Sequence, residues 1–466
     1  MFKKRRRHSF SGVLKLGTAA LALWGGYWLY QNTFTFNPDK ILENSELKQR
    51  NFETKVEEVF SRRHRIKAYL FQDKTNPIIS LRFIFKNAGL ATDDADKVGI
   101  ANMAAALLTH GAGELDNVRF NEELENNGIG LSFGADKDDF GGTLITTKDN
   151  RKKAFELLKS VLNSPRFDKG EIEQVRAQML MSLKQQQERP ERVLELAFAK
   201  ALYKNHPYAR NPIGEKEDIL RINQGQLQEF VVRHLSQNNL IVGVAGDIDA
   251  EELSEVLDEV FGGLPQTGSI NFVRPAEIDF TAGAVNVFQD TAQDMARFAA
   301  PGVERKHPDF YPLYIANYIF GGAGLNSRLN VAAREKQGLT YGIYTYLSLS
   351  DKSAFISGGF SSTLENFSKV KEILLSEWQK FGRDGVSAQE LKDAKDYLVS
   401  SYNLRFASID GIADMAAYMQ KDDLGLDFLQ KRNDYVRSVT LEDINRVIKK
   451  YFNKNTLLFV NSGKFE

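Results

Sequence analysis

Two residues in the second half of the chain carry side chains that can stabilise negative charge on a carbonyl oxygen. They are Arg334 and Tyr341, the first and last residues of the stretch Arg-Glu-Lys-Gln-Gly-Leu-Thr-Tyr. A phenol donates a hydrogen bond and a guanidinium adds positive charge, so the two together suit acyl chemistry in which an oxyanion develops. The structural interpretation is an arginine that ends a helix and a tyrosine at a strand edge. The two residues alone leave both interpretations open.

Cysteine and histidine, the residues that supply thiolate and imidazole groups, are sparse or absent. The chain has no cysteine, which excludes disulfides, a thiolate nucleophile and cysteine-ligated metals. The histidines are too scattered for a local two-histidine motif, at positions 8, 64, 110, 206, 234 and 307. We expect His110 to interact with the last carbonyls of the helix before it. A metal site rebuilt around His110 is the alternative.

Residues 98–110 form the most apolar helical pattern in the chain, Val-Gly-Ile-Ala-Asn-Met-Ala-Ala-Ala-Leu-Leu-Thr-His. A helix that is apolar on almost every side is a buried helix, and the alanines favour helix strongly. Residues 92–96 before it supply N-cap side chains, and Gly111 and Gly113 end it. From its residues alone this stretch is a core helix.

The same helix resembles the metal-binding helix of the pitrilysin/insulinase family of zinc peptidases (inverzincins), whose motif is H-x-x-E-H. On that helix Asn102 replaces the first histidine, Ala105 the glutamate base and Ala106 the second histidine. The family's third ligand, a glutamate, is expected near residues 181–183, which are Met-Ser-Leu. Zinc needs three protein ligands and an open position for water, and these residue types supply none. The resemblance therefore implies a degenerate metal site and no cofactor in this chain.

The resemblance extends over about residues 56–466 and includes three further motifs. The segment 206–208, His-Pro-Tyr, with Gly214 is similar to a turn between the family's helices, and residues 320–329 are similar to its glycine-rich second-half signature. The glycine-rich loop lacks the Gly-Lys-[Ser/Thr] ending of a P-loop, which argues against nucleotide binding. The third motif is the arginine/tyrosine pair. By resemblance, Tyr341 hydrogen-bonds the scissile carbonyl or its oxyanion, and Arg334 anchors substrate.

These motifs imply a chain that lost the metal half of a peptidase site and kept the substrate half. Some members of the family, such as mitochondrial processing peptidase, are heterodimers in which one subunit carries H-x-x-E-H and a metal-free subunit supplies the pair. We therefore expect the non-catalytic, substrate-binding subunit of a heteromeric zinc metallopeptidase, inactive alone, with zinc in the partner. Its substrate would be an extended peptide that adds as a strand near residues 131–135. The alternatives are a catalytically dead scaffold and a peptidase with a rebuilt metal site.

The first 31 residues predict a membrane anchor or a signal peptide. Residues 3–7 are all basic, and an apolar run follows at residues 10–30. About 20 such residues span a bilayer, and the aromatic residues near the end of this run suit its interface. We expect a single pass through a bacterial inner membrane with the body in the periplasm, or a periplasmic protein after signal cleavage. A mitochondrial presequence and a buried N-terminal helix are further options.

The remaining chain predicts an α+β fold of two homologous α/β sandwich halves. Acidic and basic residues are equal at 61 each, so no global field favours nucleic acid as a partner. Residues 227–240 recur at 444–457 with apolar positions paired at 227/444, 230/447, 231/448 and 235/452, and helix 169–187 has a counterpart at 387–402. We predict a tether at 32–55, domains at 56–262 and 283–466, and a linker at 263–282 rich in glycine and proline.

Overall fold

The computed structural model describes residues 55–281, 283–453 and 455–464. The predicted anchor at residues 1–31, with its membrane segment 10–30, and the tether at 32–55 apart from Lys55 lie outside the described residues. Within the described part of the chain, every helix is too short or too polar to cross a bilayer.

The first half is built on a sheet of six strands in the order β1-β2-β8-β3-β7-β6, in which only β2 and β8 are parallel neighbours. Its strands are β1 (Glu57–Phe60), β2 (Lys67–Gln72), β3 (Ile78–Phe85), β6 (Gly130–Ala135), β7 (Phe140–Thr147) and β8 (Leu240–Gly246), beside a small hairpin of β4 (Gly111–Ala112) and β5 (Leu115–Asp116). Its helices are α3 (Ile100–Leu107), α4 (Asn117–Asn126), α5 (Arg151–Asn163), α6 (Lys169–Glu188), α7 (Pro190–Tyr203), α8 (Lys216–Arg221), α9 (Gln224–His234) and α10 (Ala250–Phe261).

The second half repeats this topology with five strands in the order β11-β12-β10-β13-β9, of which only β9 and β13 are parallel neighbours. Its strands are β9 (Ala284–Phe288), β10 (Asp294–Pro301), β11 (Gly342–Ser350), β12 (Ser353–Ser362) and β13 (Leu458–Gly463). Its helices are α11 (Phe310–Asn317), α12 (Arg328–Asn330), α13 (Leu364–Asp384), α14 (Ala388–Ser400), α15 (Ile409–Lys421), α16 (Phe428–Ser438) and α17 (Leu441–Tyr451), with π-helical turns at Tyr318–Gly322 and Val331–Glu335.

The strand order of the second half is that of β6-β7-β3-β8-β2 in the first, with the same parallel pair at the same place. The helices before the parallel strands, α9 and α17, both begin with a capping box. The four apolar pairs that suggested the repeat, 227/444, 230/447, 231/448 and 235/452, are all buried. The predicted fold of two α+β halves is confirmed.

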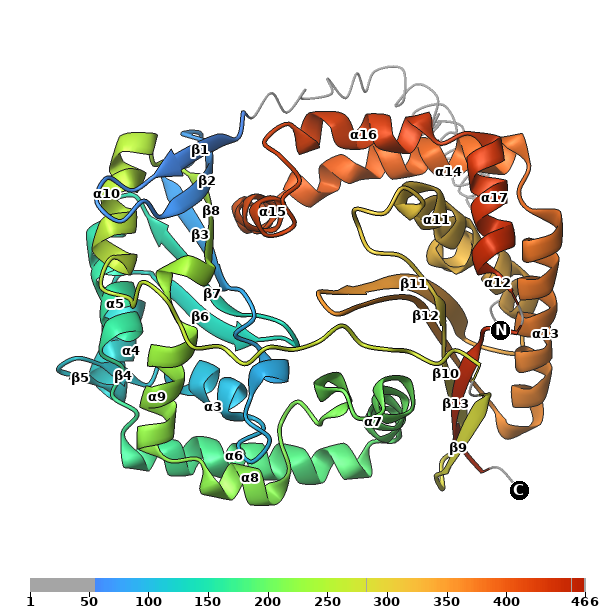
Figure 1. Ribbon diagram of the computed structural model, residues 1–466, viewed down its shortest axis with the longest axis horizontal. Coiled ribbons are helices and arrows are strands. Elements are labelled where there is room, and N and C mark those ends of the chain that lie inside the picture. Colours follow the sequence, from blue (N-terminus) through green and yellow to red (C-terminus); the bar gives the residue numbers. More distant parts are fainter. Residues whose placement is uncertain (1–54, 282, 454, 465–466) are drawn as a thin grey trace, which may run out of the picture. The chain divides into compact units, whose positions relative to one another are not determined.

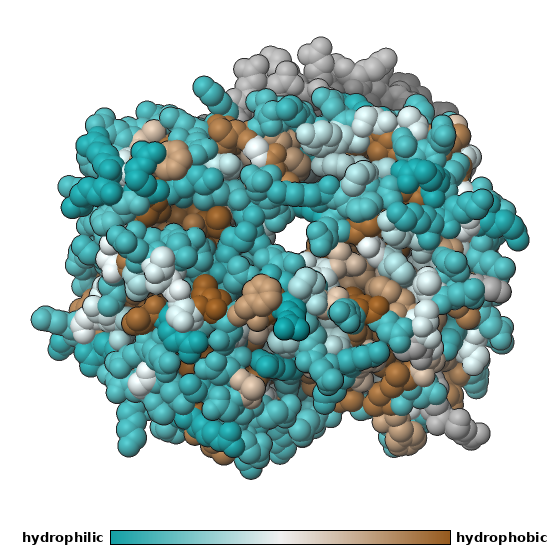
Figure 2. All heavy atoms as spheres, in the orientation of Figure 1, coloured by the Kyte–Doolittle hydropathy of each residue, from teal (hydrophilic) through white to brown (hydrophobic). Residues whose placement is uncertain are grey.

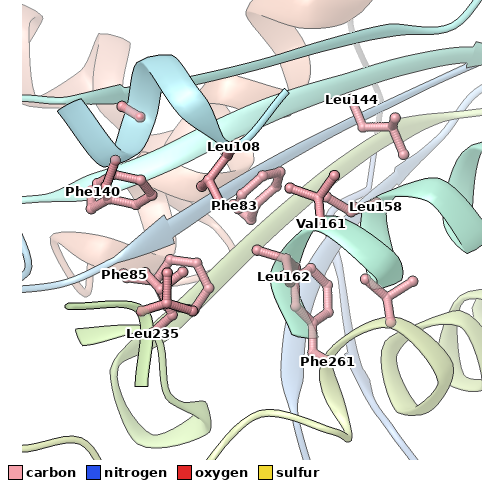
Figure 3. Packing of buried hydrophobic residues seen from close by; sticks show 14 of the residues in the cluster. Phe83, Phe85, Leu108, Phe140, Leu144, Leu158, Val161, Leu162, Leu235 and Phe261 are labelled. Carbon is pink, nitrogen blue, oxygen red and sulfur yellow. The ribbon is translucent and has the colours of Figure 1, made fainter. Parts of the chain in front are cut away.

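The core of the first half lies between the sheet and its helices (Figure 3). Phe83 on β3 is fully buried, with its ring centroid 5.5 Å from that of Phe133 and 6.0 Å from that of Phe261. On the face of the molecule shown in Figure 2 the surface is mostly hydrophilic, with apolar side chains in small patches. The aromatic residues of the first half therefore serve mainly to hold the helices on the sheet.

The two halves are joined by an exchange of helices (Figure 1). Helix α7 of the first half packs on β10 and β13 of the second, and α15 of the second half packs on β2, β3 and β8 of the first. A Cβ atom on Gly243 of β8 would lie 2.3 Å from the backbone nitrogen of Ala417 and 2.4 Å from the carbonyl oxygen of Ala413. Because only glycine permits this approach, β8 is shaped for the helix that crosses it.

We expect Phe83→Ala to lower the free energy of unfolding by about 3–5 kcal/mol, because a fully buried aromatic side chain leaves a cavity when it is removed. Phe272, which is 83% exposed, provides the control, and Phe272→Ala should change stability by less than about 0.5 kcal/mol. Urea denaturation followed by circular dichroism measures both. Equal losses for the two variants would contradict the placement of Phe83 in the core.

Candidate functional site

Helix α3, which resembles the metal-binding helix, is shorter than the predicted span of residues 98–110 and ends at Leu107. It begins after Gly99, whose φ of +97° is in the left-handed region. A Cβ atom on Gly99 would lie 2.2 Å from the carbonyl oxygen of Ile213, and one on Gly214 would lie 2.1 Å from that of Val98. The turn that holds Gly214 therefore fixes the start of α3, which explains the role of this glycine in the predicted turn motif.

A buried carboxyl group also holds the start of α3. The Oδ2 atom of Asp93 accepts a hydrogen bond of 2.8 Å from the backbone nitrogen of Gly99. Burial raises the pKa of Asp93 to about 7, although the hydrogen bond from Gly99 acts in the opposite direction. The helix start therefore depends on a group that titrates near neutral pH.

The three residues at the positions of the family's motif do not form a metal site. Asn102 donates a hydrogen bond of 2.5 Å to the carbonyl oxygen of Pro212, Ala105 is buried, and Ala106 is exposed rather than buried as the helix pattern predicted. At the expected position of the third ligand, Ser182 on α6 is exposed between Met181 and buried Leu183. These side chains cannot hold zinc, because alanine has no donor atom and an amide oxygen is a poor ligand for this ion.

The prediction for His110 is confirmed for its backbone, whose N–H group donates a hydrogen bond of 2.9 Å to the carbonyl oxygen of Leu107, the last residue of α3. Its side chain does not contact these carbonyls, because its Nδ1 atom lies 2.8 Å from Oε2 of Glu171 on α6. Asn117 donates a hydrogen bond of 2.8 Å to the same carboxylate oxygen. Among the described residues no group of three histidine or acidic side chains is placed to hold a metal ion. The contact with Glu171 therefore links His110, which follows α3, to helix α6. For a metal site rebuilt around His110, this contact supplies one further ligand, the carboxylate of Glu171.

Arg334 and Tyr341 lie at the two ends of one turn. Arg334 is on the π-helical segment Val331–Glu335, and its carbonyl oxygen accepts a hydrogen bond of 2.8 Å from Gly338, whose φ is +65°. Thr340 bonds to Ser361 on β12 and so fixes the chain before Tyr341, which directly precedes β11. Tyr341 is 79% exposed, and neither side chain has a hydrogen bond or ion pair with another described residue. Both side chains are therefore able to contact a second molecule without giving up a hydrogen bond or ion pair to another described residue.

The other sequence motifs have structural roles. In the glycine-rich stretch, Phe320 is fully buried, and a Cβ atom on Gly321 would meet Thr345 of β11 at 2.4 Å. His206 caps a short 3-10 helix, and its Nε2 atom lies 2.8 Å from the carbonyl oxygen of Arg274 in the segment between the halves. Residues 131–135 lie on β6, which is the edge strand of its sheet and contacts α3. The predicted edge is therefore present beside the degenerate helix.

A cavity of about 650 Å³ between the halves borders the start of α3, with Val98 and Pro212 in its wall. Its second-half wall centres on Arg297, which is 8% exposed and donates hydrogen bonds of 2.9 Å to the hydroxyl groups of both Tyr344 and Tyr346. The Nε atom of Arg297 lies 3.3 Å from Glu195 on α7. The sequence did not predict this cluster, although the alternating tyrosines at positions 344 and 346 were a signal for it.

Two sequence models of one protein family match the chain, and together they cover residues in both halves. Residues 68–216 match Insulinase (Peptidase family M16), and residues 221–398 match the Peptidase M16 inactive domain. The chain belongs to peptidase family M16. This confirms the family predicted from the degenerate helix and the arginine/tyrosine pair.

Relatives of this M16 chain include a protein described as non-peptidase homolog YmxG from Helicobacter pylori, 28% identical over 388 residues that cover 82% of this chain and 89% of that protein. The crystal structure of a peptidase M16 inactive domain from Pseudomonas fluorescens has a TM-score of 0.82 and 25% identity, covering 88% of this chain and 98% of that one. The periplasmic protease PqqL from Escherichia coli shares the fold, with a TM-score of 0.74, 15% identity and coverage of 88% and 45%. In this M16 chain the residues at the positions of the H-x-x-E-H motif are Asn102, Ala105 and Ala106.

We expect the stability of the chain to fall as pH rises from about 4 to about 7, as far as Asp93 determines it. Its pKa of about 7 in the folded protein exceeds the value near 3.9 of an unfolded aspartate, so the folded state binds more protons in this window. In Asp93→Asn, which can still accept the hydrogen bond from Gly99, this part of the pH dependence should vanish. Thermal melting at pH 5 and pH 8 measures the difference, and parallel shifts in both proteins would contradict the assignment.

Proposed function

We propose that this M16 chain is the metal-free, substrate-binding subunit of a heteromeric zinc peptidase. The observation that carries the proposal is the turn between Arg334 and Tyr341, which presents both side chains unengaged in a chain whose own α3 cannot hold zinc. A phenol and a guanidinium in this state can turn toward a bound peptide without breaking a hydrogen bond or ion pair to another described residue. The partner is an M16 subunit with an intact H-x-x-E-H motif, which holds the metal.

The position of the pair along β11 supports a site shared between two molecules. The opposite end of β11 contacts the first half, where the backbone nitrogen of Asp351 donates a hydrogen bond of 2.9 Å to Asp138. β11 has nine residues, so Tyr341 lies roughly 30 Å from that contact at about 3.3 Å per residue. Neither Arg334 nor Tyr341 lines the cavity that borders α3. The pair is therefore available to another subunit rather than to this chain's own degenerate helix.

In the proposed complex each residue of this chain has a distinct task. The hydroxyl group of Tyr341 donates a hydrogen bond to the scissile carbonyl oxygen as negative charge develops on it, and Arg334 binds the peptide and adds positive charge. At a second place, beside this chain's own α3, the free edge of β6 can pair with another stretch of extended peptide through backbone hydrogen bonds, which give affinity with little dependence on sequence. The partner's zinc supplies the activated water.

We place the complex in the periplasm, tethered to the inner membrane by the predicted anchor at residues 10–30 or released by signal cleavage. The basic residues 3–7 before the apolar run support this orientation. The periplasmic location in the name of the structural relative PqqL agrees with it.

We expect the purified chain to hold no stoichiometric zinc and to cleave no peptide, and to give peptidase activity when mixed with an H-x-x-E-H subunit from the same organism. Metal analysis and cleavage of a quenched fluorescent peptide measure both. A chain that adds nothing to the activity of its partner would favour the scaffold alternative. Zinc bound to this chain alone, with cleavage that persists at high purity, would favour a rebuilt metal site.

We expect Tyr341→Phe to lower kcat of the mixed complex by about 10²–10³-fold, the usual effect of losing one oxyanion donor, with little change in KM. Tyr397→Phe is the matched control, because Tyr397 is 55% exposed and stacks on Tyr318 without a hydrogen bond from its hydroxyl group to another described residue. Steady-state kinetics separates the two. An unchanged kcat in Tyr341→Phe would remove Tyr341 from the chemistry.

A further inference from the structure

A second cavity, of about 470 Å³, lies wholly within the second half, between β11 and helices α11, α15 and α16. Three arginines and seven aromatic rings line it, and none of its lining residues is acidic. Its volume falls in the range of small-molecule sites, which are mostly apolar with a few convergent polar groups. The composition of its wall indicates an anionic ligand with an apolar part.

Arg432 is a buried cation in the wall of this cavity and has no carboxylate counter-ion among the described residues. It is 6% exposed, and its Nη1 atom donates hydrogen bonds of 2.7 Å to the carbonyl oxygen of Leu398 and 3.0 Å to Asn433. Its guanidinium lies 4.1 Å from the ring centroid of Tyr402, and it forms no ion pair with a described carboxylate. A buried charge without a counter-ion is costly, so the fold keeps this arginine at an energetic disadvantage that a bound anion would relieve.

Arg405 adds a second unpaired cation to the same wall. It is exposed, lies 5.9 Å from the ring centroid of Tyr402 and forms no ion pair with a described carboxylate. The third arginine, Arg305, has its Nε atom 3.6 Å from Asp422 and is therefore partly neutralised. Two guanidinium groups on one side of the cavity are thus available to a carboxylate.

Two buried polar atoms in the wall of this cavity have no hydrogen-bond partner among the described residues. They are the Oδ1 atom of Asn317, a residue that is 6% exposed, and the Oγ1 atom of Thr345, which is 2% exposed. Asn317 directly precedes the π-helical segment Tyr318–Gly322, and such segments occur frequently at functional sites. An amide oxygen can only accept, so the ligand that completes this wall carries an N–H or O–H donor.

The aromatic rings supply the apolar part of the site. Burial raises the pKa values of Tyr311 and Tyr318 to about 12, so these side chains remain neutral and provide no internal anion for the arginines. The rings of Phe310 and Tyr314 are stacked with centroids 6.2 Å apart, which leaves a flat surface. A planar ring on the ligand would gain most from such a wall.

We propose that this cavity binds an organic carboxylate that carries an N–H donor and an aromatic ring. An aromatic residue at the free carboxyl end of a peptide has this chemistry, and so does a free N-acylated aromatic amino acid. The carboxylate binds Arg432 and Arg405, and the N–H group donates to Oδ1 of Asn317. The hydroxyl group of Thr345 donates to the acyl carbonyl oxygen of the ligand, and the ring packs on the tyrosines. The site contains neither Arg334 nor Tyr341, and all of its lining residues belong to this chain. Ligand binding at this site therefore does not depend on the proposed peptidase complex.

Isothermal titration calorimetry on the purified chain tests this proposal with three probes. N-acetyl-phenylalanine should bind at least about tenfold more tightly than its neutral amide, because a charge-assisted hydrogen bond to a buried arginine is lost in the amide. A tripeptide that ends in phenylalanine identifies the source: tighter binding than N-acetyl-phenylalanine indicates a peptide terminus, and weaker binding indicates the free compound. Equal binding of acid and amide, or no binding of either, would overturn the proposal.

Variants separate the ligand role from a structural one. Arg432→Gln and Arg405→Gln should each weaken binding of N-acetyl-phenylalanine, by about tenfold and about threefold, and Arg437→Gln on the exposed face of α16 should not. If Arg432→Gln fails to fold, Thr345→Val decides, since it removes an unpartnered hydroxyl group. Thr345→Val should keep or raise the melting temperature and still weaken binding. Unchanged affinity in Arg405→Gln and Thr345→Val would overturn the proposal.

Discussion

The arrangement of this molecule depends on a group of buried polar contacts where the two sheets meet. The turn between β11 and β12 inserts against the loop between β6 and β7, where Asp138 accepts hydrogen bonds from the hydroxyl group of Tyr208 and from the backbone nitrogen of Asp351. Lys421 at the end of α15 pairs with Asp139 and lies 3.4 Å from Asp351. Charged groups this deeply placed are tolerated only when paired and hydrogen-bonded, so these contacts fix the register of one half against the other.

The same contacts determine which surfaces remain available. They commit one end of β11 to the first half and leave the other end, with Tyr341, exposed. The exchange of α7 and α15 packs each half on the sheet of the other, and the cavity around Arg297 lies between them. Because Arg334 and Tyr341 lie at the free end of β11, they are better placed to reach the active site of a partner subunit than to act beside α3 of this chain. This placement is the physical basis of the proposal that substrate binding and metal binding belong to different subunits.

The contacts that hold α3 are separate from the positions where active members of the family carry their metal ligands. The position of α3 depends on Gly99 and Gly214, on the carboxyl group of Asp93, and on the core beneath it, none of which is a metal ligand. Asn102 replaces a ligand with a hydrogen bond to Pro212, and Ala105 fills a buried position with a methyl group. The residues that hold α3 in place are different from those at the metal-ligand positions. The helix can therefore keep its position without metal ligands at residues 102, 105 and 106.

Much of this protein follows from local patterns in its sequence. Helix periodicity predicted helices at 98–110 and 169–187, and the repeated apolar positions from 227 and 444 predicted two like halves, because one set of buried side chains suits one topology. The absence of metal ligands at positions 102, 105 and 106 was also readable, since residue type alone decides it. The end of α3 and the contact of His110 with Glu171 were not, because they depend on how α6 crosses α3. Only the tertiary structure brought together Arg297 with Glu195 and Arg432 with Asn317, since no local periodicity records which distant side chains share a cavity.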